Sequence, residues 1–301
     1  MKALFYAGYP LPWAPGGHSV QIQESQCRLE DMGIAVDWLQ HETKPAKDFT
    51  ILHYWTRPPN DLHWQLAKQQ GLKVVISELL PSSVLRPRVS WRLRAALRPM
   101  LKHVIGAGLF ETLGIGIYGN ADAAIAVNSL EADYMVQVLG AKPDRTHVIP
   151  NGVDPIFLNA SPESEPFDGL VYLAYIRSIK NQLEVAMRAK EAQVPVKFVG
   201  GAWAADDPYV EAFRRVVDNR WVFWEGEVRD RRRLCAVVRG AKGLCLASRF
   251  EAQPLALLES LACGTPVMGP DLPGIRASFG NAIRYCGPPQ RAQFAGELKS
   301  F

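Results

Sequence analysis

The 301-residue sequence lacks several features that would decide its class at once. It contains five cysteines, an odd number with no C-x-x-C pair, which argues against a disulfide framework or a zinc site and favours reduced thiols. No stretch reaches 18 uninterrupted apolar residues, so no transmembrane helix is predicted. The N-terminal MKALFYAGYPLPWAPGG carries one lysine and an apolar run broken by prolines, unlike a signal peptide. These absences predict a cytoplasmic protein.

The composition excludes further classes. The net charge of +4 is too small to predict a nucleic-acid partner. Hydrophobic residues make up 48% of the chain and charged residues 21%, which is typical of a packed globular protein and not of a disordered chain, a collagen or a coiled coil. A chain of this length has room for two domains of ordinary size or for one large domain.

Strand-like apolar runs alternate with helical patterns along the whole chain. Consecutive apolar residues in the strands, separated by helices, predict parallel sheets covered on both faces, and two such series in tandem predict two Rossmann-like α/β domains. The strands are expected at 3–7, 34–39, 50–55, 73–77, 123–127 and 147–149, then at 170–175, 196–199, 222–224, 244–247 and 266–269. The helices are expected near 17–32, 61–70, 91–118 and 129–139, then near 181–193, 207–219, 230–240 and 254–263.

The segment 150–169 separates the two series. Its sequence PNGVDPIFLNASPESEPFDG is rich in Pro, Asn, Ser and acids and reads as a linker, so we expect domains at 1–155 and 156–301. Ligands of open α/β sheets bind outside the carboxyl ends of the strands, which places a ligand in the cleft between two facing domains.

Residues 246–270 carry the most specific pattern. A strand is followed by a turn, a helix opened by Pro254, a Gly264 cap and a further strand, with Glu251 in the turn and Glu259 in the helix. A helix N-terminus suits an anion such as a pyrophosphate, and a carboxylate can accept two hydrogen bonds from a ribose diol. Spacing alone leaves open an ordinary α/β unit with two solvated acids.

The segment SRFEAQPLALLESLACGTPV (248–267) resembles the E-x7-E element of the retaining glycosyltransferases of family 4, which have the GT-B fold. Three further segments resemble that family in order and spacing: PGGHSVQ at 15–21, HVIPNGVD at 147–154 and YIRSIKNQ at 175–182. The resemblance implies an acceptor side in the first domain and a nucleotide-sugar donor side in the second.

The resemblance also implies roles for individual residues. Arg177 and Lys180 would hold the donor diphosphate and stabilise the charge that grows as it departs, although they could also be an exposed basic loop. Glu251 would contact the donor sugar, and Glu259 would bind the ribose hydroxyls. Further donor contacts are expected at the turn and at the first glycine loop: Ala252, Gln253, Pro254, Leu255, Gly16 and Gly17. Contacts with the donor or the acceptor are further expected at His18, Glu78 and Asn151.

No cofactor or metal is expected. The chain contains no D-x-D, the metal–diphosphate handle of the other glycosyltransferase fold, and cationic side chains with a helix dipole can replace that metal. The family's favoured mechanism is a front-face substitution, with a covalent enzyme–sugar intermediate as the alternative.

The sequence departs from the family pattern in several places. Many members carry a His after the strand at 73–77, where this chain has Ser77 and Glu78, and Glu78 could instead cap the following turn. The usual glycine-rich turn after the first Glu reads AQP, and only two residues separate Arg177 from Lys180. The chain stops at Phe301, earlier than family members usually do, which suggests a short member or a missing piece.

Residues 86–105 form a basic amphipathic stretch. No acid occurs between Glu78 and Glu111, whereas leucines, Met100 and other apolar residues recur at helical spacing beside arginines, with Pro99 among them. The stretch could contact an anionic membrane surface, or its apolar face could pack on the first sheet with the arginines solvated or holding an anionic acceptor. RDRRR (229–233) reads as a solvated helix start, and HYW (53–55) could stack on a sugar or belong to the core.

The sequence therefore predicts a retaining, metal-independent glycosyltransferase of hexosyltransferase type. It would move a sugar from a nucleoside-diphosphate sugar to a glycan, lipid-linked or small-molecule acceptor, with no nucleic-acid partner. A GT-B epimerase or phosphorylase would lack the E-x7-E element. The alternative from another class is a degenerate, non-catalytic nucleotide-sugar-binding subunit of a glycosyltransferase complex.

Overall fold

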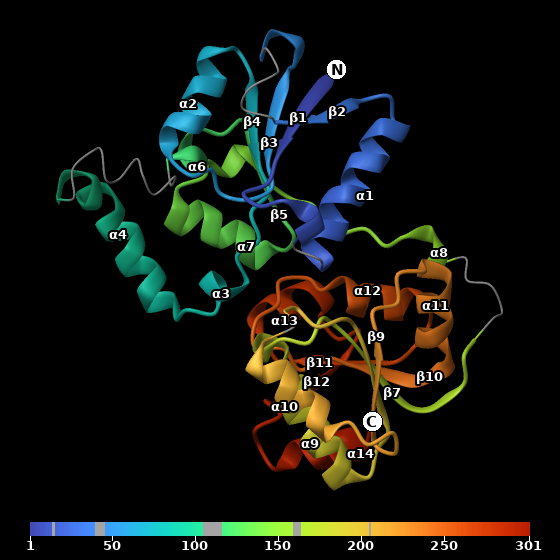
Figure 1. Ribbon diagram of the computed structural model, residues 1–301. Helices are drawn as coiled ribbons and strands as arrows, with labels where there is room; N and C mark the ends of the chain where they lie inside the picture. Colours follow the sequence, from blue (N-terminus) through green and yellow to red (C-terminus); the bar gives the residue numbers. More distant parts are fainter. Residues whose placement is uncertain (14–15, 40–45, 105–115, 159–163, 205) are drawn as a thin grey trace. The chain divides into compact units, whose positions relative to one another are not determined.

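The computed structural model describes residues 1–13, 16–39, 46–104, 116–158, 164–204 and 206–301. It consists of two compact units, residues 1–150 and 151–301 (Figure 1). Each unit is built on one six-stranded sheet in which every pair of neighbouring strands is parallel. The predicted α/β architecture with two parallel sheets is confirmed.

Unit 1 contains the sheet with strand order β2-β1-β3-β4-β5-β6. Its strands are β1 (Lys2–Tyr6), β2 (Ala35–Trp38), β3 (Ile51–Tyr54), β4 (Lys73–Ile76), β5 (Ala123–Ala126) and β6 (Thr146–Val148). Its described helices are α1 (Gly17–Asp31), α2 (Asp61–Gln69), α3 (Pro81–Val84), α4 (Arg88–Val104), α6 (Ile117–Asn120) and α7 (Ser129–Tyr134), the last continued by a π-helical turn, Met135–Leu139. The central strands are apolar on both faces because helices cover both, as the consecutive buried residues Leu4 and Phe5 of β1 show, which pack in different core clusters.

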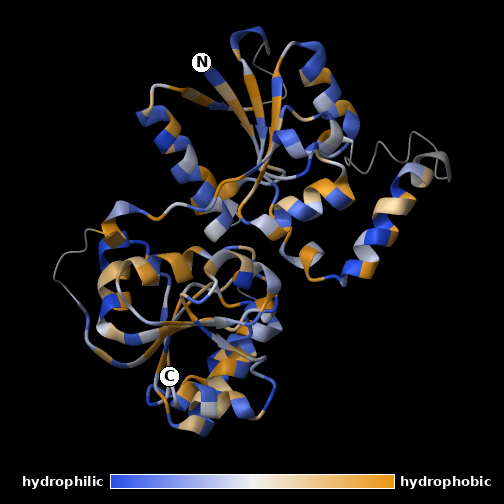
Figure 2. Cartoon of the chain, turned by 180° about the vertical axis from the view of Figure 1, so that it is seen from behind, coloured by the Kyte–Doolittle hydropathy of each residue, from blue (hydrophilic) through white to orange (hydrophobic). Residues whose placement is uncertain are grey.

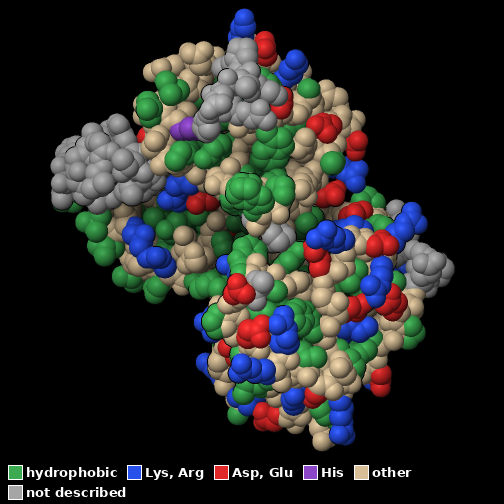
Figure 3. All heavy atoms as spheres, in the orientation of Figure 1, with side chains coloured by type: hydrophobic (Ala, Val, Ile, Leu, Met, Phe, Trp, Pro, Cys, Tyr) green, Lys and Arg blue, Asp and Glu red, His purple; other side chains and the backbone are tan. Residues whose placement is uncertain are grey.

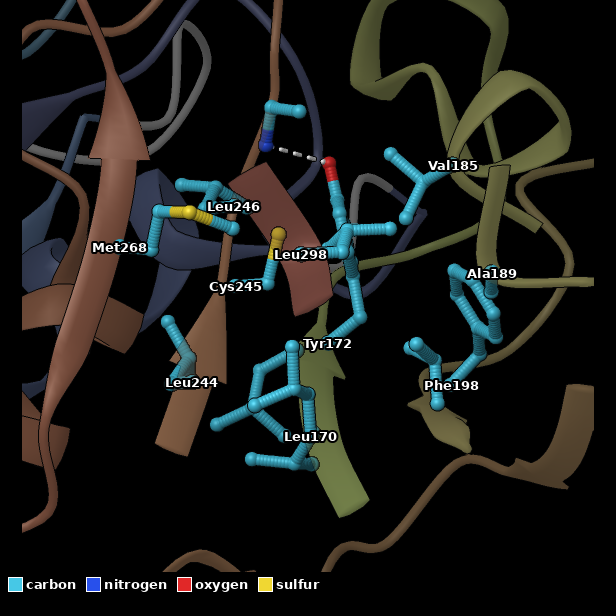
Figure 4. Packing of buried hydrophobic residues seen from close by; sticks show 14 of the residues in the cluster. Leu170, Tyr172, Val185, Ala189, Phe198, Leu244, Cys245, Leu246, Met268 and Leu298 are labelled. Carbon is cyan, nitrogen blue, oxygen red and sulfur yellow. Dashed lines mark hydrogen bonds between the residues drawn. The ribbon is translucent and has the colours of Figure 1, made fainter. Parts of the chain in front are cut away.

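Unit 2 contains the sheet with strand order β12-β11-β10-β7-β8-β9. Its strands are β7 (Phe167–Leu173), β8 (Val196–Val199), β9 (Val222–Gly226), β10 (Ala241–Cys245), β11 (Val267–Pro270) and β12 (Arg284–Cys286). Its helices are α8 (Pro155–Leu158), α9 (Gln182–Ala192), α10 (Pro208–Val216), α11 (Arg231–Gly240), α12 (Leu255–Ala262), α13 (Pro273–Phe279) and α14 (Gln293–Lys299). Leu170, Tyr172 and Phe198 lie in its core (Figure 4).

The segment expected to be a linker is largely part of unit 2. Asn151 bonds to Gln253, and α8 places Phe157 in a fully buried position, so the chain joins unit 2 directly after Pro150. The linker interpretation fails for this part of the segment because Asn151 and Phe157 make these contacts with unit 2, so the chain here is not a free connection. Residues 159–163 of the expected linker lie outside the described residues.

The described elements differ from the predicted ones mainly at their ends. The helix expected over 91–118 begins earlier, at Arg88, and is described to Val104 with Pro99 inside it, while 105–115 lie outside the described residues. Strand β12 was not predicted, because RYC is too short to carry a periodic signal. In the segment 53–55, His53, Tyr54 and Trp55 are all buried, as the core reading requires.

Glu131 in α7 is a buried carboxylate that makes unit 1 sensitive to pH. It is fully buried, its Oε1 accepts a hydrogen bond from the Leu80 N–H at 2.6 Å, and burial raises its pKa to about 7. Because the folded chain then holds a proton that the unfolded chain has lost, the free energy of unfolding falls as pH rises from about 4.5 to about 7. The loss amounts to at most about 3 kcal/mol. Urea denaturation of Glu131→Gln should lack this slope; an unchanged slope would contradict the assignment.

Among the described residues, no helix is long and apolar enough to cross a membrane. All five cysteines are free thiols, and the Cys235 and Cys263 sulfurs lie 3.4 Å apart.

Candidate functional site

The loop after β7 is held in shape by two of its own polar residues. Asn181 is buried with a positive φ of 56°, and its Nδ2 donates to the Ala247 carbonyl at 2.7 Å. Gln182 is also buried; its Nε2 donates to the Tyr175 carbonyl at 2.7 Å, and its Oε1 accepts from the Arg177 N–H at 3.3 Å. These bonds fix the backbone that carries Arg177 and Lys180.

A second set of contacts joins this loop to the turn after β10. The Arg249 N–H donates to the Ile179 carbonyl at 2.8 Å. Beneath both segments the buried Tyr172 hydroxyl accepts a hydrogen bond from the Ala247 N–H at 3.0 Å, drawn as the dashed line in Figure 4, and donates to the Lys180 carbonyl. Because β7 and β10 are adjacent parallel strands, their carboxyl ends bring the two loops together.

Lys180 and Glu251 meet at this point. Lys180 Nζ lies 2.5 Å from Glu251 Oε1, and the Glu251 side chain is only 10% exposed. The two residues are 71 positions apart, so the pair exists only because the two loops are joined. The structure thus places the cation and the acid that the sequence assigned to diphosphate and sugar within reach of one ligand.

Arg177 is positioned by a tryptophan that the sequence interpretation did not include. Its guanidinium carbon lies 4.0 Å from the centre of the Trp203 ring. Trp203 follows Gly200, whose φ is +148° and where a Cβ would come within 2.1 Å of the Ala174 carbonyl oxygen. Only glycine allows the chain after β8 to pass so close to the Arg177 loop, which brings the indole under the guanidinium.

We expect Trp203→Ala to weaken nucleoside-diphosphate binding by about two- to fivefold, because an exposed cation–π contact contributes about 0.5–1 kcal/mol. A similar pair lies just before β9, at the other end of the strand from this site, where the Arg220 guanidinium carbon is 5.1 Å from the centre of the Trp221 ring. Trp221→Ala is therefore the matched control. Equal losses in the two variants, measured by calorimetric titration, would contradict the role of Trp203.

Helix α12 begins at Leu255 with Pro254 as its N-cap residue, one position later than predicted, and no side chain caps its first turn. The helix ends with Gly264 at φ +75°, where the Gly264 N–H donates to Leu261 and the Thr265 N–H donates to Ser260, the Schellman pattern. Because no side chain caps its first turn, the N-terminal end of α12 presents N–H groups without a side-chain partner and the positive end of the helix dipole beside Glu251.

Glu259 lies on α12 and is paired with an arginine. Its side chain is 7% exposed, and its Oε1 accepts from Arg231 Nη2 at 2.7 Å. Arg231 also lies 3.5 Å from Asp154 and stacks 4.7 Å from the ring of the buried Phe157. Burial raises the pKa of Glu259, and Arg231 counters that rise.

The interpretation of RDRRR as a solvated helix start is therefore wrong for Arg231. Asp230 caps α11 by accepting from the Arg232 and Arg233 N–H groups, as expected at a helix start. Arg231, however, points back to α12 and α8 and is only 30% exposed. A sequence run of like charges does not reveal which of its members faces a buried carboxylate 28 residues away.

Asn151 and Gln253 hold each other. The Asn151 N–H donates to Gln253 Oε1 at 2.6 Å, and Asn151 Nδ2 donates to the Gln253 carbonyl at 2.8 Å. Their side chains thus fix the turn before α12. On the other side of that turn, Gly274 packs so closely that a Cβ would lie 3.0 Å from the Glu251 carbonyl oxygen, and Ser278 Oγ donates to the Ala252 carbonyl.

The remaining predicted site residues lie in unit 1. Gly16 is the N-cap residue of α1 with φ +149° and Gly17 is its first residue, as the glycine loop predicts. His18 follows, with Nδ1 2.7 Å from the Tyr9 hydroxyl; burial lowers its pKa, and a backbone hydrogen bond with Trp55 partly offsets this. The residues around Tyr9 line an open cavity of about 720 Å³ at the carboxyl end of β1.

Glu78 is already engaged by side chains of unit 1. Its Oε2 accepts from Arg57 Nε at 3.1 Å and from the Tyr118 hydroxyl. The following helix α3 has Leu80 as its N-cap residue, so Glu78 does not cap it. Among the described residues, no group of three or more His, Cys, Asp or Glu side chains could hold a metal ion.

Comparison with known proteins covers both units. Residues 35–157 match the model of glycosyltransferase family 4, and residues 172–300 match that of glycosyl transferases group 1. Alpha-maltose-1-phosphate synthase of Mycolicibacterium smegmatis is 29% identical over 176 residues. That match covers 52% of this chain and 45% of the relative, so the chain spans less than half of that protein's length.

Solved structures show the same fold at low sequence identity. The Anabaena protein HepE in complex with UDP-glucose is 16% identical, with all of this chain and 89% of that chain covered and a TM-score of 0.69. Sucrose-phosphate synthase from Thermosynechococcus elongatus is 16% identical, with 99% and 88% covered and a TM-score of 0.70. The two family models match consecutive parts of the chain, and each unit contains a parallel sheet. This chain therefore belongs to glycosyltransferase family 4 and has the GT-B fold.

Proposed function

We propose that this protein transfers a sugar from a nucleoside-diphosphate sugar to an acceptor hydroxyl with retention of anomeric configuration, and without a metal ion. The observation that carries the proposal is the contact between Lys180 and Glu251 at the carboxyl ends of two adjacent strands. A lysine that binds the leaving diphosphate and an acid that contacts the sugar must flank the same anomeric bond, and these two side chains touch.

The donor class is supported by the chemistry of unit 2. Arg177, Lys180 and the uncapped N-terminus of α12 supply positive charge and N–H donors, which suit a diphosphate. Glu259 supplies a carboxylate for ribose hydroxyls. HepE has been solved with UDP and with UDP-glucose, and the proposal extends a donor of that class to this chain.

The reaction breaks the bond between the anomeric carbon and the diphosphate oxygen and forms one to the acceptor oxygen. Lys180 and Arg177 would stabilise the charge that develops on the departing diphosphate, in place of a metal ion. In a front-face substitution the departing diphosphate accepts the acceptor's proton. Glu251 would stabilise positive charge on the sugar ring in the transition state.

Donor binding would rearrange the ion pair that the structure shows. Lys180 would turn from Glu251 to the diphosphate, which frees the Glu251 carboxylate for the sugar. Arg231 holds Glu259 in place, so the ribose contact would need no such rearrangement. The acceptor would bind in unit 1, and the reaction would take place in the cytoplasm, in keeping with the five free thiols.

The test is a transfer assay on the full chain with UDP-, GDP- and ADP-sugars in the presence of EDTA, followed by NMR of the product. We expect slow release of the sugar to water or its transfer to an acceptor. Because configuration is retained, an α-configured donor should give an α-configured product. A β-configured product would contradict retention, and activity only after Mg²⁺ or Mn²⁺ addition would contradict metal independence.

The second candidate is a nucleotide-sugar-binding subunit without activity of its own. The observation in its favour concerns Glu78, which stands where many family members carry His. Its carboxylate already accepts hydrogen bonds from Arg57 and Tyr118. Donor binding by calorimetry with no turnover under any condition would favour this candidate over the transferase.

A further inference from the structure

Helix α4 has two faces of opposite character. Trp91 and Arg98 lie on one face, with Ala95 between them at helical spacing. Trp91 is buried and meets the Tyr134 ring edge-on at 4.9 Å. Arg98 lies against Gly140, where a Cβ would come within 1.4 Å of Arg98 Nη1. This face fastens α4 to the rest of unit 1.

The opposite face is apolar and open. At about 100° per residue, Val89, Leu93, Leu97 and Met100 fall on one stripe on the far side of the helix from Trp91. Their exposed fractions are 76%, 58%, 46% and 58%, so the described residues leave the stripe uncovered. Figure 2 shows hydrophobic and hydrophilic residues alternating along this helix. A single exposed leucine is ordinary, but four apolar side chains in one stripe indicate a contact surface.

The borders of the stripe are positively charged. Arg92 and Arg94 lie on its two sides, both are exposed, and neither has an acid within 4.0 Å among the described residues. Arg88 stacks on Trp91 at 4.0 Å and has only a long, exposed contact of 3.4 Å with Asp133. In Figure 3 hydrophobic and basic side chains adjoin each other on the side of unit 1 where Figure 1 draws α4.

We propose that the stripe Val89, Leu93, Leu97 and Met100, with its flanking arginines, binds the surface of a membrane that contains anionic lipid. Lying in the plane of the interface, α4 would place its apolar side chains among the acyl chains while the arginines reach the lipid phosphates. This surface includes none of the proposed donor residues, and its function does not depend on the proposed reaction.

Charge decides between a lipid surface and a second copy of this chain. If two copies met at this face, the unpaired Arg92 and Arg94 of each would be brought against those of the other, which is unfavourable. One helix stripe of four side chains is also small beside the roughly 800 Å² per partner that a stable protein interface buries. An anionic lipid surface instead supplies the missing negative charge and needs no matching shape.

The test measures binding of the full chain to sedimented vesicles of phosphatidylcholine alone and of phosphatidylcholine with phosphatidylglycerol. We expect binding only to the anionic vesicles, weakened by added salt. Replacing Leu93 and Leu97 together by Gln should lower the partition coefficient by at least tenfold, and Arg92→Gln with Arg94→Gln by roughly thirtyfold.

Helix α2 offers a matched control. Leu62 and Leu66 have the same spacing and similar exposure, 56% and 49%, on another helix of unit 1, so Leu62→Gln with Leu66→Gln should leave binding unchanged. Thermal unfolding confirms that each variant is folded. Absence of binding to anionic vesicles, or an equal loss in both leucine variants, would overturn the proposal. So would dimerisation of the free protein, seen by sedimentation, that disappears in the Leu93 and Leu97 variant.

Discussion

Replacing Lys180 with Ala is expected to lower kcat about 100- to 1,000-fold while the chain remains folded. A preorganised positive group aimed at charge that develops in the transition state contributes about 2.7–4 kcal/mol. The backbone of Lys180 is preorganised, because hydrogen bonds from Asn181, Tyr172 and Arg249 fix its loop before any ligand arrives, and only its side chain has to turn from Glu251 to the diphosphate. Because the lysine acts on the departing diphosphate, the loss should be larger in kcat than in KM.

The matched control for Lys180 is Lys190, at the other end of α9. Lys190 Nζ lies 3.1 Å from Asp218, so this is also a lysine–acid pair of unit 2, but it lies at the end of the helix away from Glu251. Lys190→Ala should leave kcat within a factor of two. A Lys180→Ala enzyme with near-normal kcat would contradict the assignment of Lys180 to the diphosphate.

Removing Arg231 is expected to destabilise unit 2. Arg231→Ala leaves Glu259 buried without its counter-ion, which costs about 2 kcal/mol; the full 3–5 kcal/mol of a buried pair is not expected because Arg231 is 30% exposed. The pKa of Glu259, already raised by burial, should rise further. Nucleotide affinity should fall about tenfold, since Glu259 is no longer held toward the ribose.

The pH dependence of this variant follows from the sign of that shift. A carboxyl whose folded pKa lies above its unfolded value costs nothing below the unfolded value of about 4.5, and its cost grows as pH rises through the folded pKa. Arg231→Ala should therefore be close to wild type in urea denaturation at pH 4.5 and lose stability towards neutral pH. Arg233→Ala is the control, because Arg233 pairs with Glu165 and Glu225 at the surface. Equal effects of the two substitutions at neutral pH would refute the special role of Arg231.

The backbone framework of this protein is readable in its sequence. Strands such as β4 and β5 fall within short apolar runs bounded by turn residues, and that pattern depends only on neighbours along the chain. The E-x7-E spacing likewise lies within one turn and one helix. For the same reason the Schellman end of α12 could be predicted from Gly264 alone.

Contacts between distant segments could not be predicted in this way. The pair of Arg231 with Glu259 depends on how α11 packs beside α12, and the position of Trp203 under Arg177 depends on a close approach that Gly200 allows. The exposed stripe of α4 was visible as a periodicity, but its direction was not. Which face of an amphipathic helix is buried is decided by Trp91 and Arg98 packing on unit 1, not by the distribution of leucines.

The measurement that tests the central claim most directly is calorimetric binding of UDP, GDP and ADP in the presence of EDTA, to the wild-type chain and to Glu259→Ala. The account predicts that one nucleotide binds without metal. It also predicts that Glu259→Ala weakens that binding by about tenfold or more, since a charged hydrogen bond contributes roughly 1.5–3 kcal/mol. Failure of all three nucleotides to bind, or equal affinity of the wild type and Glu259→Ala, would contradict the assignment of the donor site to Arg177, Lys180, Glu251 and Glu259.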